Sequence, residues 1–407
     1  MYRLAMLSFH GCPVARLGEK DTGGMNVYVL QLAKELGKRG NQVDVYTRRH
    51  DPDDPQIVDL GDGARVIHLD AGPHDGAKDV LYQYIPEFLS SLHAFQRTEG
   101  IAYDLIHSHY WLSSWVGTVL SKDWNVPHAL TFHTLAKNKL RARAGEAETE
   151  LRLSTEKRLA DSVDAIVVST TEEKEDLRRY YQVPRHRVQV IPPGVDLELF
   201  QPMEKADARQ LLGLREEKVI LYVGRVESLK GLNILLQAVA ILDDAANTRL
   251  LIVGGSSEND RELQRLGTMA QRLGIEDSVT FTGSLRQTEL PTYYGAADVF
   301  VLPSYYESFG LVALEAMACG TPVVASRVGG LKTFVEDGKT GYLIPWRCPE
   351  PFAQRLDVLL ANPDLRATMG KAARAKARQM SWSGVVDRMQ DFYAFLLGET
   401  WESIAGA

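Results

Sequence analysis

The sequence predicts an α/β protein with two doubly wound domains, each a parallel sheet covered by helices. Short apolar runs rich in β-branched residues alternate with amphipathic stretches along the chain, which is the pattern of repeated βαβ units. The 407 residues exceed one domain of about 150 residues. Two prolines and a glycine at 192–194 interrupt the alternation. We therefore predict a first domain over 1–193 and a second over 194–381.

In the first domain, the pattern predicts a strand at 3–9, a helix at 25–38 and a strand at 43–47. Two further helices are expected at 111–121 and 172–180. The other expected strands, all placed in one parallel sheet, are 66–69, 104–107, 129–132, 165–169 and 188–191.

The second domain repeats this alternation and then becomes wholly helical. Its expected strands are 219–223, 249–253, 279–282, 299–302, 322–325 and 342–344. After Pro349 only helical patterns remain, with Asn362-Pro363 as a break and an amphipathic stretch at 382–397. A terminal helix without a strand must pack on a formed layer, so we expect 382–407 to pack back on the first domain.

Composition excludes several classes of function. Hydrophobic residues make up 45% and charged residues 24%, which excludes intrinsic disorder. Forty-six Lys and Arg against 53 Asp and Glu give a net charge of -7, so no overall positive field attracts nucleic acid or anionic lipid. An anion that binds must be held by a local cluster of cations.

The cysteines and the apolar runs bear on location. Cys12, Cys319 and Cys348 are too few and too widely spaced for a disulfide framework or a CxxC pair. The apolar run at 1–10 is too short for a secretory signal, and no run reaches the 18 or more apolar residues that cross a bilayer. We expect a cytoplasmic protein that binds no nucleic acid and is not stably inserted in a membrane.

Two loops that follow first strands are candidates for anion binding, because ligands of open parallel sheets bind at the carboxyl ends of strands. After the first strand, Gly23 and Gly24 would let the backbone approach a phosphate or a sugar, although an ordinary tight turn is the alternative. The loop lacks GxGxxG and so does not indicate NAD. In the second domain, Arg225 and Lys230 flank the corresponding turn and suit a departing diphosphate, with solvated surface cations as the alternative.

The stretch 303–316 is the most informative in the chain because it holds two glutamates, Glu307 and Glu315, eight residues apart. If both were helical they would lie about 12 Å apart along the axis. This exceeds the roughly 5–9.5 Å that separates the carboxyl pair of a glycosidase. We therefore expect them to bind two ends of one long ligand, with the amides of 309–312 directed at it.

Histidines follow two strands of the first domain. His107 and His109 could share a metal ion, but no third ligand has suitable spacing. We therefore predict no protein-bound metal ion. Mg²⁺ is possible, but not as an ion bound by the protein. Asp51–Pro55 contains an Asp-x-Asp pattern that we interpret as a solvated loop. His133, directly after a strand, is expected in a cleft rather than in the core.

These pieces, in this order and spacing, resemble the family 4 retaining nucleotide-sugar glycosyltransferases of the GT-B fold. The matching second-domain pieces are Gly224–Gly231, Glu307–Glu315, 320–325, 329–330 and 337–341. The first domain resembles a narrower branch, the inositol-phosphate glycosyltransferases of the mycothiol pathway with sucrose-phosphate synthases as relatives, through 21–28, 71–73, 106–113 and 133–135. The resemblance implies two Rossmann-like domains that face each other across a cleft, with the C-terminal helix crossing back to the first.

The resemblance also implies roles for single residues on the donor side. Arg225 and Lys230 would hold the donor diphosphate, and Glu315 would accept hydrogen bonds from the ribose. Glu307 would bind the transferred sugar, and His133 would meet its 6-hydroxyl side. The predicted donor-binding residues are Gly23, Gly24, Arg225, Lys230, Glu307, Phe309, Gly310, Leu311 and Glu315, and the predicted catalytic residues are Arg225, Lys230, His133 and Glu307.

On the acceptor side, four residues match positions that bind the acceptor phosphate in that branch: Lys78, Tyr110, Thr134 and Arg152. Asn26 matches a hydroxyl contact. The chain departs from the branch in a loop one residue shorter around Lys78 and in Leu153-Ser154-Thr155 after Arg152. From the helical pattern alone, a solvated Arg152 is the alternative.

The sequence thus predicts a hexosyltransferase that moves a sugar from a nucleotide diphosphate sugar, a UDP-sugar, to a phosphorylated small polyol or sugar such as inositol phosphate. Retention follows from the family, and the absence of a carboxylate from 132–135 favours a front-face mechanism. The alternatives are a sucrose-phosphate synthase that uses fructose 6-phosphate, an enzyme with a lipid-linked acceptor, an epimerase or phosphorylase of the same fold, and a two-lobed binding protein. A homodimer is compatible with each.

Overall fold

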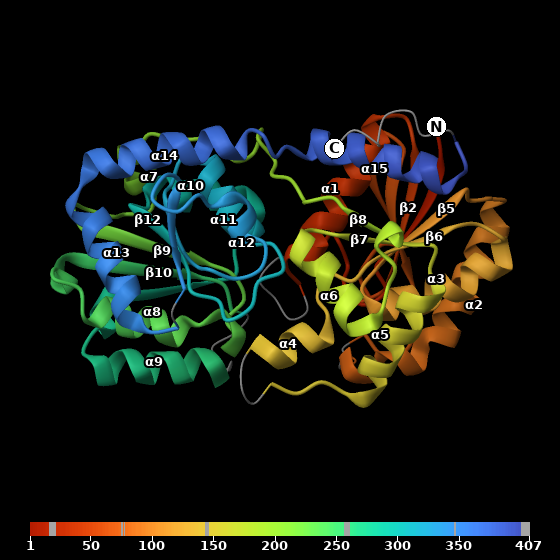
Figure 1. Cartoon of the computed structure of the whole chain (residues 1–407), viewed down its shortest axis with the longest axis horizontal. Helices are drawn as coiled ribbons and strands as arrows, with labels where there is room; N and C mark the ends of the chain where they lie inside the picture. Colours follow the sequence, from red (N-terminus) through yellow and green to blue (C-terminus); the bar gives the residue numbers. More distant parts are fainter. Residues whose placement is uncertain are drawn as a thin grey trace. The chain divides into compact units, whose positions relative to one another are not determined.

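The computed structural model describes residues 1–15, 22–74, 76, 78–142, 146–255, 261–345 and 347–399. These residues form two compact units (Figure 1). Unit 1 contains 1–15, 24–193 and 382–399, and unit 2 contains 22–23 and 194–381. Each unit is a sheet with helices packed on it, so the predicted α/β fold with two doubly wound, Rossmann-like parts is confirmed.

Unit 1 is built on an eight-stranded sheet of order β3-β4-β2-β1-β5-β6-β7-β8. Its strands are β1 (Arg3–Leu7), β2 (Gln42–Arg48), β3 (Ile57–Gly61), β4 (Ala64–Leu69), β5 (Leu105–His109), β6 (His128–Thr131), β7 (Ala165–Val168) and β8 (Val188–Val190). The strands predicted for this sheet are parallel to one another, but the prediction missed the edge strand β3, which pairs antiparallel with β4, so the sheet is not wholly parallel. The residues of β3 are exposed or half-buried, as is usual for an edge strand.

Helices cover this sheet and include the C-terminal one. They are α1 (Gly24–Lys38), α2 (Ile85–Glu99), α3 (Trp111–Trp124), α4 (Ala136–Ala142), α5 (Glu150–Ser162), α6 (Thr171–Tyr181) and α15 (Trp382–Leu396). In Figure 1, α15 lies along α1, and the rings of Trp382 and Tyr28 are 5.4 Å apart. Arg39, directly after α1, forms an ion pair of 2.9 Å with Asp387 of α15. The last helix is therefore an integral layer of unit 1.

Unit 2 has a wholly parallel six-stranded sheet of order β11-β10-β9-β12-β13-β14. Its strands are β9 (Lys218–Val223), β10 (Thr248–Val253), β11 (Val279–Gly283), β12 (Val299–Leu302), β13 (Val323–Ser326) and β14 (Gly341–Ile344). Its helices are α7 (Lys205–Leu211), α8 (Leu232–Ala240), α9 (Arg261–Leu273), α10 (Leu290–Ala296), α11 (Leu311–Ala318), α12 (Leu331–Phe334), α13 (Pro349–Ala361) and α14 (Pro363–Ala377). Within the described ranges, no helix has the length and apolar character needed to cross a membrane.

The strand order reverses direction at one point in each sheet. In unit 1 the reversal lies between β1 and β5, and in unit 2 it lies between β9 and β12. In doubly wound sheets, ligands bind beyond the carboxyl ends of the two strands at this point, because the loops there turn away to opposite faces. The fold thus predicts functional loops after β1, β5, β9 and β12.

Candidate active site

The loop after β9 in unit 2 presents Arg225. Its backbone is fixed by Tyr222, whose hydroxyl donates to the Arg225 carbonyl oxygen at 2.8 Å. The Arg225 side chain is 42% exposed and pairs with Glu227 at 3.1 Å. The backbone at Gly23 lies beside it, since a Cβ on Gly23 would be 3.6 Å from Nε of Arg225. Arg225 is therefore accessible at the edge where a ligand of this sheet would lie.

The same loop contains Lys230, which lies next to the loop that follows β12. Gly231 has a φ of +69°, and a Cβ there would overlap the Pro303 carbonyl oxygen, so only glycine allows this approach. The Tyr305 amide donates to the Leu229 carbonyl oxygen at 2.8 Å. Nζ of Lys230 then lies 2.7 Å from Oε2 of Glu307. Two predicted donor residues from different loops are thus brought into contact.

Gly310 begins α11 and turns the chain out of the loop that carries Glu307. Its φ of +98° is a conformation that residues with side chains rarely adopt. The preceding Phe309 is buried in the core of unit 2, and Leu311 is the first residue of α11. The first amides of a helix lack intrahelical acceptors, so this turn presents backbone donors as the sequence predicts.

Glu315 lies within α11 and is buried. Its carboxylate accepts hydrogen bonds from the Tyr294 hydroxyl at 3.0 Å and from Nε2 of Gln287 at 3.3 Å. Burial raises the pKa of Glu315 to about 7, so both the charged and the neutral form are populated near neutral pH. A carboxylate has about four acceptor positions, and these two bonds leave capacity for ligand hydroxyls.

In unit 1, Tyr110 follows β5 and is the centre of a cation cluster. Its φ of 79° and ψ of 161° fall in a region used almost only by glycine. Nζ of Lys78 lies 4.3 Å from the centroid of its ring, and the guanidinium carbon of Arg152 lies 5.0 Å from it. Three of the four residues expected at the acceptor phosphate therefore meet at one aromatic ring.

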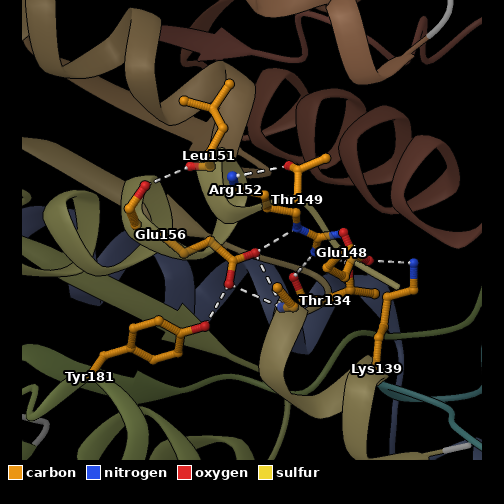
Figure 2. Close-up of polar contacts among 10 residues, drawn as sticks. Thr134, Lys139, Glu148, Thr149, Leu151, Arg152, Glu156 and Tyr181 are labelled. Carbon is orange, nitrogen blue, oxygen red and sulfur yellow. Dashed lines mark hydrogen bonds and ion pairs between the residues drawn. The ribbon is translucent and has the colours of Figure 1, made fainter. Parts of the chain in front are cut away.

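Arg152 joins the fourth residue, Thr134, to this cluster (Figure 2). Its terminal nitrogen donates to the Thr134 carbonyl oxygen at 3.1 Å and to its hydroxyl at 3.4 Å. The guanidinium also pairs with Glu148 and with Glu156, each at 2.8 Å. The Arg152 side chain is only 5% exposed, so the interpretation as a solvated cation is wrong.

His133 lies after β6 and also has an unusual backbone. Its φ of 61° is left-handed, and its Nε2 lies 3.0 Å from Nδ1 of His109. The Tyr28 ring is 5.1 Å away. Burial lowers the pKa of His133 to about 3, so the imidazole is neutral at physiological pH. It is therefore suited to a neutral hydrogen bond and not to a charged one.

The neighbouring His107 has hydroxyl partners on both ring nitrogens. Nδ1 lies 2.7 Å from the Tyr393 hydroxyl of α15, and Nε2 lies 2.9 Å from the Thr131 hydroxyl. Within the described residues, no group of three or more His, Cys, Asp or Glu side chains is arranged to hold a metal ion.

Comparisons with known proteins agree with this geometry. Residues 22–199 match the family model "Glycosyltransferase Family 4", and residues 204–376 match "Glycosyl transferases group 1". The D-inositol 3-phosphate glycosyltransferase of Corynebacterium jeikeium is 42% identical over 96% of this chain and 96% of its own. That of Corynebacterium glutamicum is 41% identical over the same shares. The chain belongs to the family 4 glycosyltransferases of the GT-B fold.

A solved structure gives the same result. Sucrose-phosphate synthase from Thermosynechococcus elongatus superposes with a TM-score of 0.91 at 37% identity, over 98% of this chain and all of its own. The predicted resemblance to GT-B glycosyltransferases is therefore confirmed over nearly the whole chain. The chain is an enzyme.

Asn26 contacts the segment that follows β1. It is buried near the start of α1, and its Nδ2 donates to the Cys12 carbonyl oxygen at 2.7 Å. Gly24 is the first residue of α1. Of the matching segment 21–28, Asp21 lies outside the described residues.

A pocket in unit 1 contains a carboxyl group that the sequence analysis missed. Residues 131–135 line it together with 167–169, Glu173 and Leu177. The Glu173 carboxylate accepts from the Ser169 amide at 2.8 Å, and the Glu173 amide donates to the Thr170 hydroxyl at 3.0 Å. Burial raises the pKa of Glu173 to about 8, so it is mostly neutral at pH 7 and a poor nucleophile. The Thr170-x-x-Glu173 spacing of a capping box is the signal that could have placed it at a helix start.

Proposed function

We propose that this glycosyltransferase moves a hexosyl unit from a UDP-sugar to a hydroxyl group of a small phosphorylated polyol such as inositol phosphate. The observation that carries the proposal is the meeting of Lys78 and Arg152 at the Tyr110 ring, beside Thr134. In an acidic chain, such a cluster marks a site for an anion. The names of the curated relatives, which match over nearly their whole length, support a phosphorylated polyol as that anion.

The acceptor would bind in unit 1. A phosphate group can accept charge-assisted hydrogen bonds from Lys78 and Arg152 and a further bond from the Thr134 hydroxyl. Asn26 would contact a hydroxyl group of the polyol ring. The Tyr110 ring holds both cations by cation–π attraction, so they are positioned before the acceptor arrives.

The donor would bind at the switch point of unit 2. Arg225 and Lys230 would neutralise the diphosphate, and the amides that begin α11, together with Gly23 and Gly24, would approach it closely. Glu315 would accept bonds from the ribose hydroxyls. Glu307, now paired with Lys230, would bind the transferred sugar together with the backbone of Phe309–Leu311. His133 would offer a neutral hydrogen bond to the 6-hydroxyl side.

The reaction forms a bond between the acceptor oxygen and the anomeric carbon while the bond from that carbon to the diphosphate breaks. The proton of the acceptor hydroxyl passes to the departing phosphate oxygen, so no protein base is consumed. Arg225 and Lys230 stabilise the charge that develops on the diphosphate. Because the acceptor enters from the face that the diphosphate leaves, the configuration is retained.

A panel assay tests the proposal. Purified protein is offered several nucleotide sugars with inositol phosphate, free inositol, fructose 6-phosphate and a lipid-linked acceptor, and products are identified by mass spectrometry. We expect a hexosyl inositol phosphate from a UDP-sugar. Transfer to none of the phosphorylated acceptors would overturn the proposal.

Sucrose-phosphate synthesis is the second candidate, because the structural match at a TM-score of 0.91 is to such an enzyme. Both acceptors carry a phosphate and would use the same cations. Faster transfer to fructose 6-phosphate than to inositol phosphate would select this candidate.

Three accompanying measurements address the setting of the reaction. The assay with and without a chelator tests our expectation that no protein-bound metal is required. Size-exclusion chromatography tests for a homodimer. Because three widely spaced cysteines fit a reducing compartment, we place the enzyme in the cytoplasm, and fractionation of cells that express it tests this.

A further inference from the structure

Two carboxylates bind the Arg152 guanidinium, and they differ in how firmly the protein holds them (Figure 2). Glu156 is fully buried. Besides Arg152, it accepts from the Tyr181 hydroxyl at 2.6 Å and from the Ala136 amide at 3.0 Å. With three kinds of donor from three elements around it, Glu156 is a fixed structural partner of Arg152.

Glu148 is held differently. It lies outside regular structure, one residue before Thr149, the N-cap of α5. Its Oε1 accepts from Arg152 at 2.8 Å and from Nζ of Lys139 at 2.7 Å. Both contacts are to long cationic side chains, and the Lys139 side chain is 28% exposed. Among the described residues, no backbone amide donates to this carboxylate, and the Glu148 side chain is 10% exposed, so rotation of the side chain can separate it from Arg152.

We propose that Glu148 is a specificity-determining residue: its carboxylate occupies the face of Arg152 that the acceptor phosphate takes over. The inference rests on the proposed function, because it assumes that the cluster around Tyr110 is the acceptor phosphate site. A carboxylate and a phosphate present the same acceptor oxygens to a guanidinium, and a phosphate dianion carries more charge.

The charges around the site explain why this selects for phosphorylated acceptors. Glu148 pairs with Lys139 and Arg152, Glu156 pairs with Arg152, and Lys78 lies with Arg152 at the Tyr110 ring. A neutral polyol brings no negative charge to replace that of Glu148 at Arg152. A phosphate dianion does bring such a charge, and the displaced Glu148 keeps Lys139 as its partner. Glu148 therefore lowers the binding affinity of every acceptor, and it excludes acceptors that carry little charge.

The test compares Glu148→Gln with Glu150→Gln at constant ionic strength. Glu150 begins α5, is exposed, and loses the same charge two residues away, so it controls for a general change in the local field. We measure the Kd of inorganic phosphate by calorimetry, and the KM values of inositol phosphate and of the donor. In Glu148→Gln we expect phosphate to bind about tenfold more tightly and the acceptor KM to fall several-fold, with an unchanged donor KM. The control should bind phosphate as the unmodified protein does.

Equal or weaker phosphate binding by Glu148→Gln would overturn the inference, and so would an equal gain in the control. Glu148→Ala provides a second variant if Gln keeps a hydrogen bond to Arg152, and heat unfolding confirms that each variant folds. The proposed function fails separately, when the unmodified protein transfers to no phosphorylated acceptor. In that case the phosphate Kd still decides whether Glu148 competes with anions at Arg152.

Discussion

The two units hold their functional cations in opposite ways. In unit 1 the Arg152 side chain is 5% exposed and has two carboxylate partners, whereas in unit 2 the Arg225 side chain is 42% exposed and has one. A buried guanidinium needs carboxylate partners to offset the cost of removing its charge from water, whereas an exposed guanidinium stays hydrated and does not. Arg152 is therefore held in one position before any ligand binds, as the proposed acceptor site requires, while the exposed Arg225 side chain keeps rotational freedom.

The units also reach their turns by different backbone solutions. The loops of unit 2 use glycine where φ is positive, as at Gly231 and Gly310. Unit 1 instead places Tyr110 and His133 in such conformations, which cost about 1–3 kcal/mol each. In the part of the chain that the structure describes, the other non-glycine residues with positive φ are Asp62 between β3 and β4, and Asn125 and Gln182 at helix ends. The backbone strain outside ordinary turns thus lies at Tyr110 and His133, two of the predicted site residues.

Removal of Arg152 should have the largest effect on stability. Arg152→Ala leaves Glu156 buried without its cation, and we expect unfolding free energy to fall by about 3–5 kcal/mol. Chemical denaturation measures this. Arg158→Ala, on the exposed side of the same helix, is the control and should change stability by less than about 1 kcal/mol.

A second variant separates charge from packing. Arg152→Ala combined with Glu156→Gln removes the unpaired charge and should recover part of the loss. If the double variant is no more stable than the single one, the unpaired buried charge does not cause the loss of stability. The contrast drawn between the cations of the two units would then be wrong.

Removal of Lys230 should affect turnover more than folding. We expect Lys230→Ala to lower kcat by about 10²–10³, since one electrostatic group at a departing diphosphate is lost. The Lys230 and Glu307 side chains are only 16% and 14% exposed, so the unpaired Glu307 should lower the unfolding free energy by about 1–3 kcal/mol. Lys218→Ala, at the other end of β9, is the matched control. Near-normal turnover in Lys230→Ala would count heavily against the donor assignment.

The pH dependence of stability should report Glu315. Its folded pKa of about 7 lies above its ordinary value of 4.5, so its contribution is full below pH 4.5 and is lost as pH rises through 7. The shift of about 2.5 units corresponds to about 3 kcal/mol for this buried group. Glu315→Gln should lack this decline, which calorimetry between pH 5 and 8 would show. Parallel profiles for the two proteins would contradict the assignment of the raised pKa.

Ligand binding gives the opposite trend at the same residue. Ribose hydroxyls donate to the ionised carboxylate, so the donor KM should rise several-fold between pH 8 and pH 6 as Glu315 takes up a proton. This rise should be absent in Glu315→Gln.

The smallest effect on turnover is expected at Tyr393. Tyr393→Phe removes the hydroxyl partner of Nδ1 of His107 and should cost about 1–3 kcal/mol. His133 should keep its contacts, so kcat should change less than twofold. A large loss of turnover with unchanged stability would show that the histidines act as one functional group.

Sequence reasoning placed the candidate loops after β1, β9 and β12 because apolar runs and glycine spacing are local signals, whereas the strand order that makes them switch points came from the structure. It missed β3, whose residues are partly exposed at a sheet edge. It also missed Glu148 and Glu156, since acids four residues on either side of Arg152 look like a solvated helix face. The burial of Glu156 depends on Tyr181 and Ala136, and Glu148 is paired with Lys139, all of which come from other elements. Such long-range contacts have no pattern in one sequence.

The return of α15 to unit 1 has a consequence for biosynthesis. The helix that packs on α1 is translated after the whole of 194–381. Unit 2 can therefore fold while the chain is still attached to the ribosome, whereas the hydroxyl of Tyr393 reaches His107 only after that segment has been made. Until then the nascent amino-terminal half leaves uncovered the side of α1 that α15 packs against, including the Tyr28 ring.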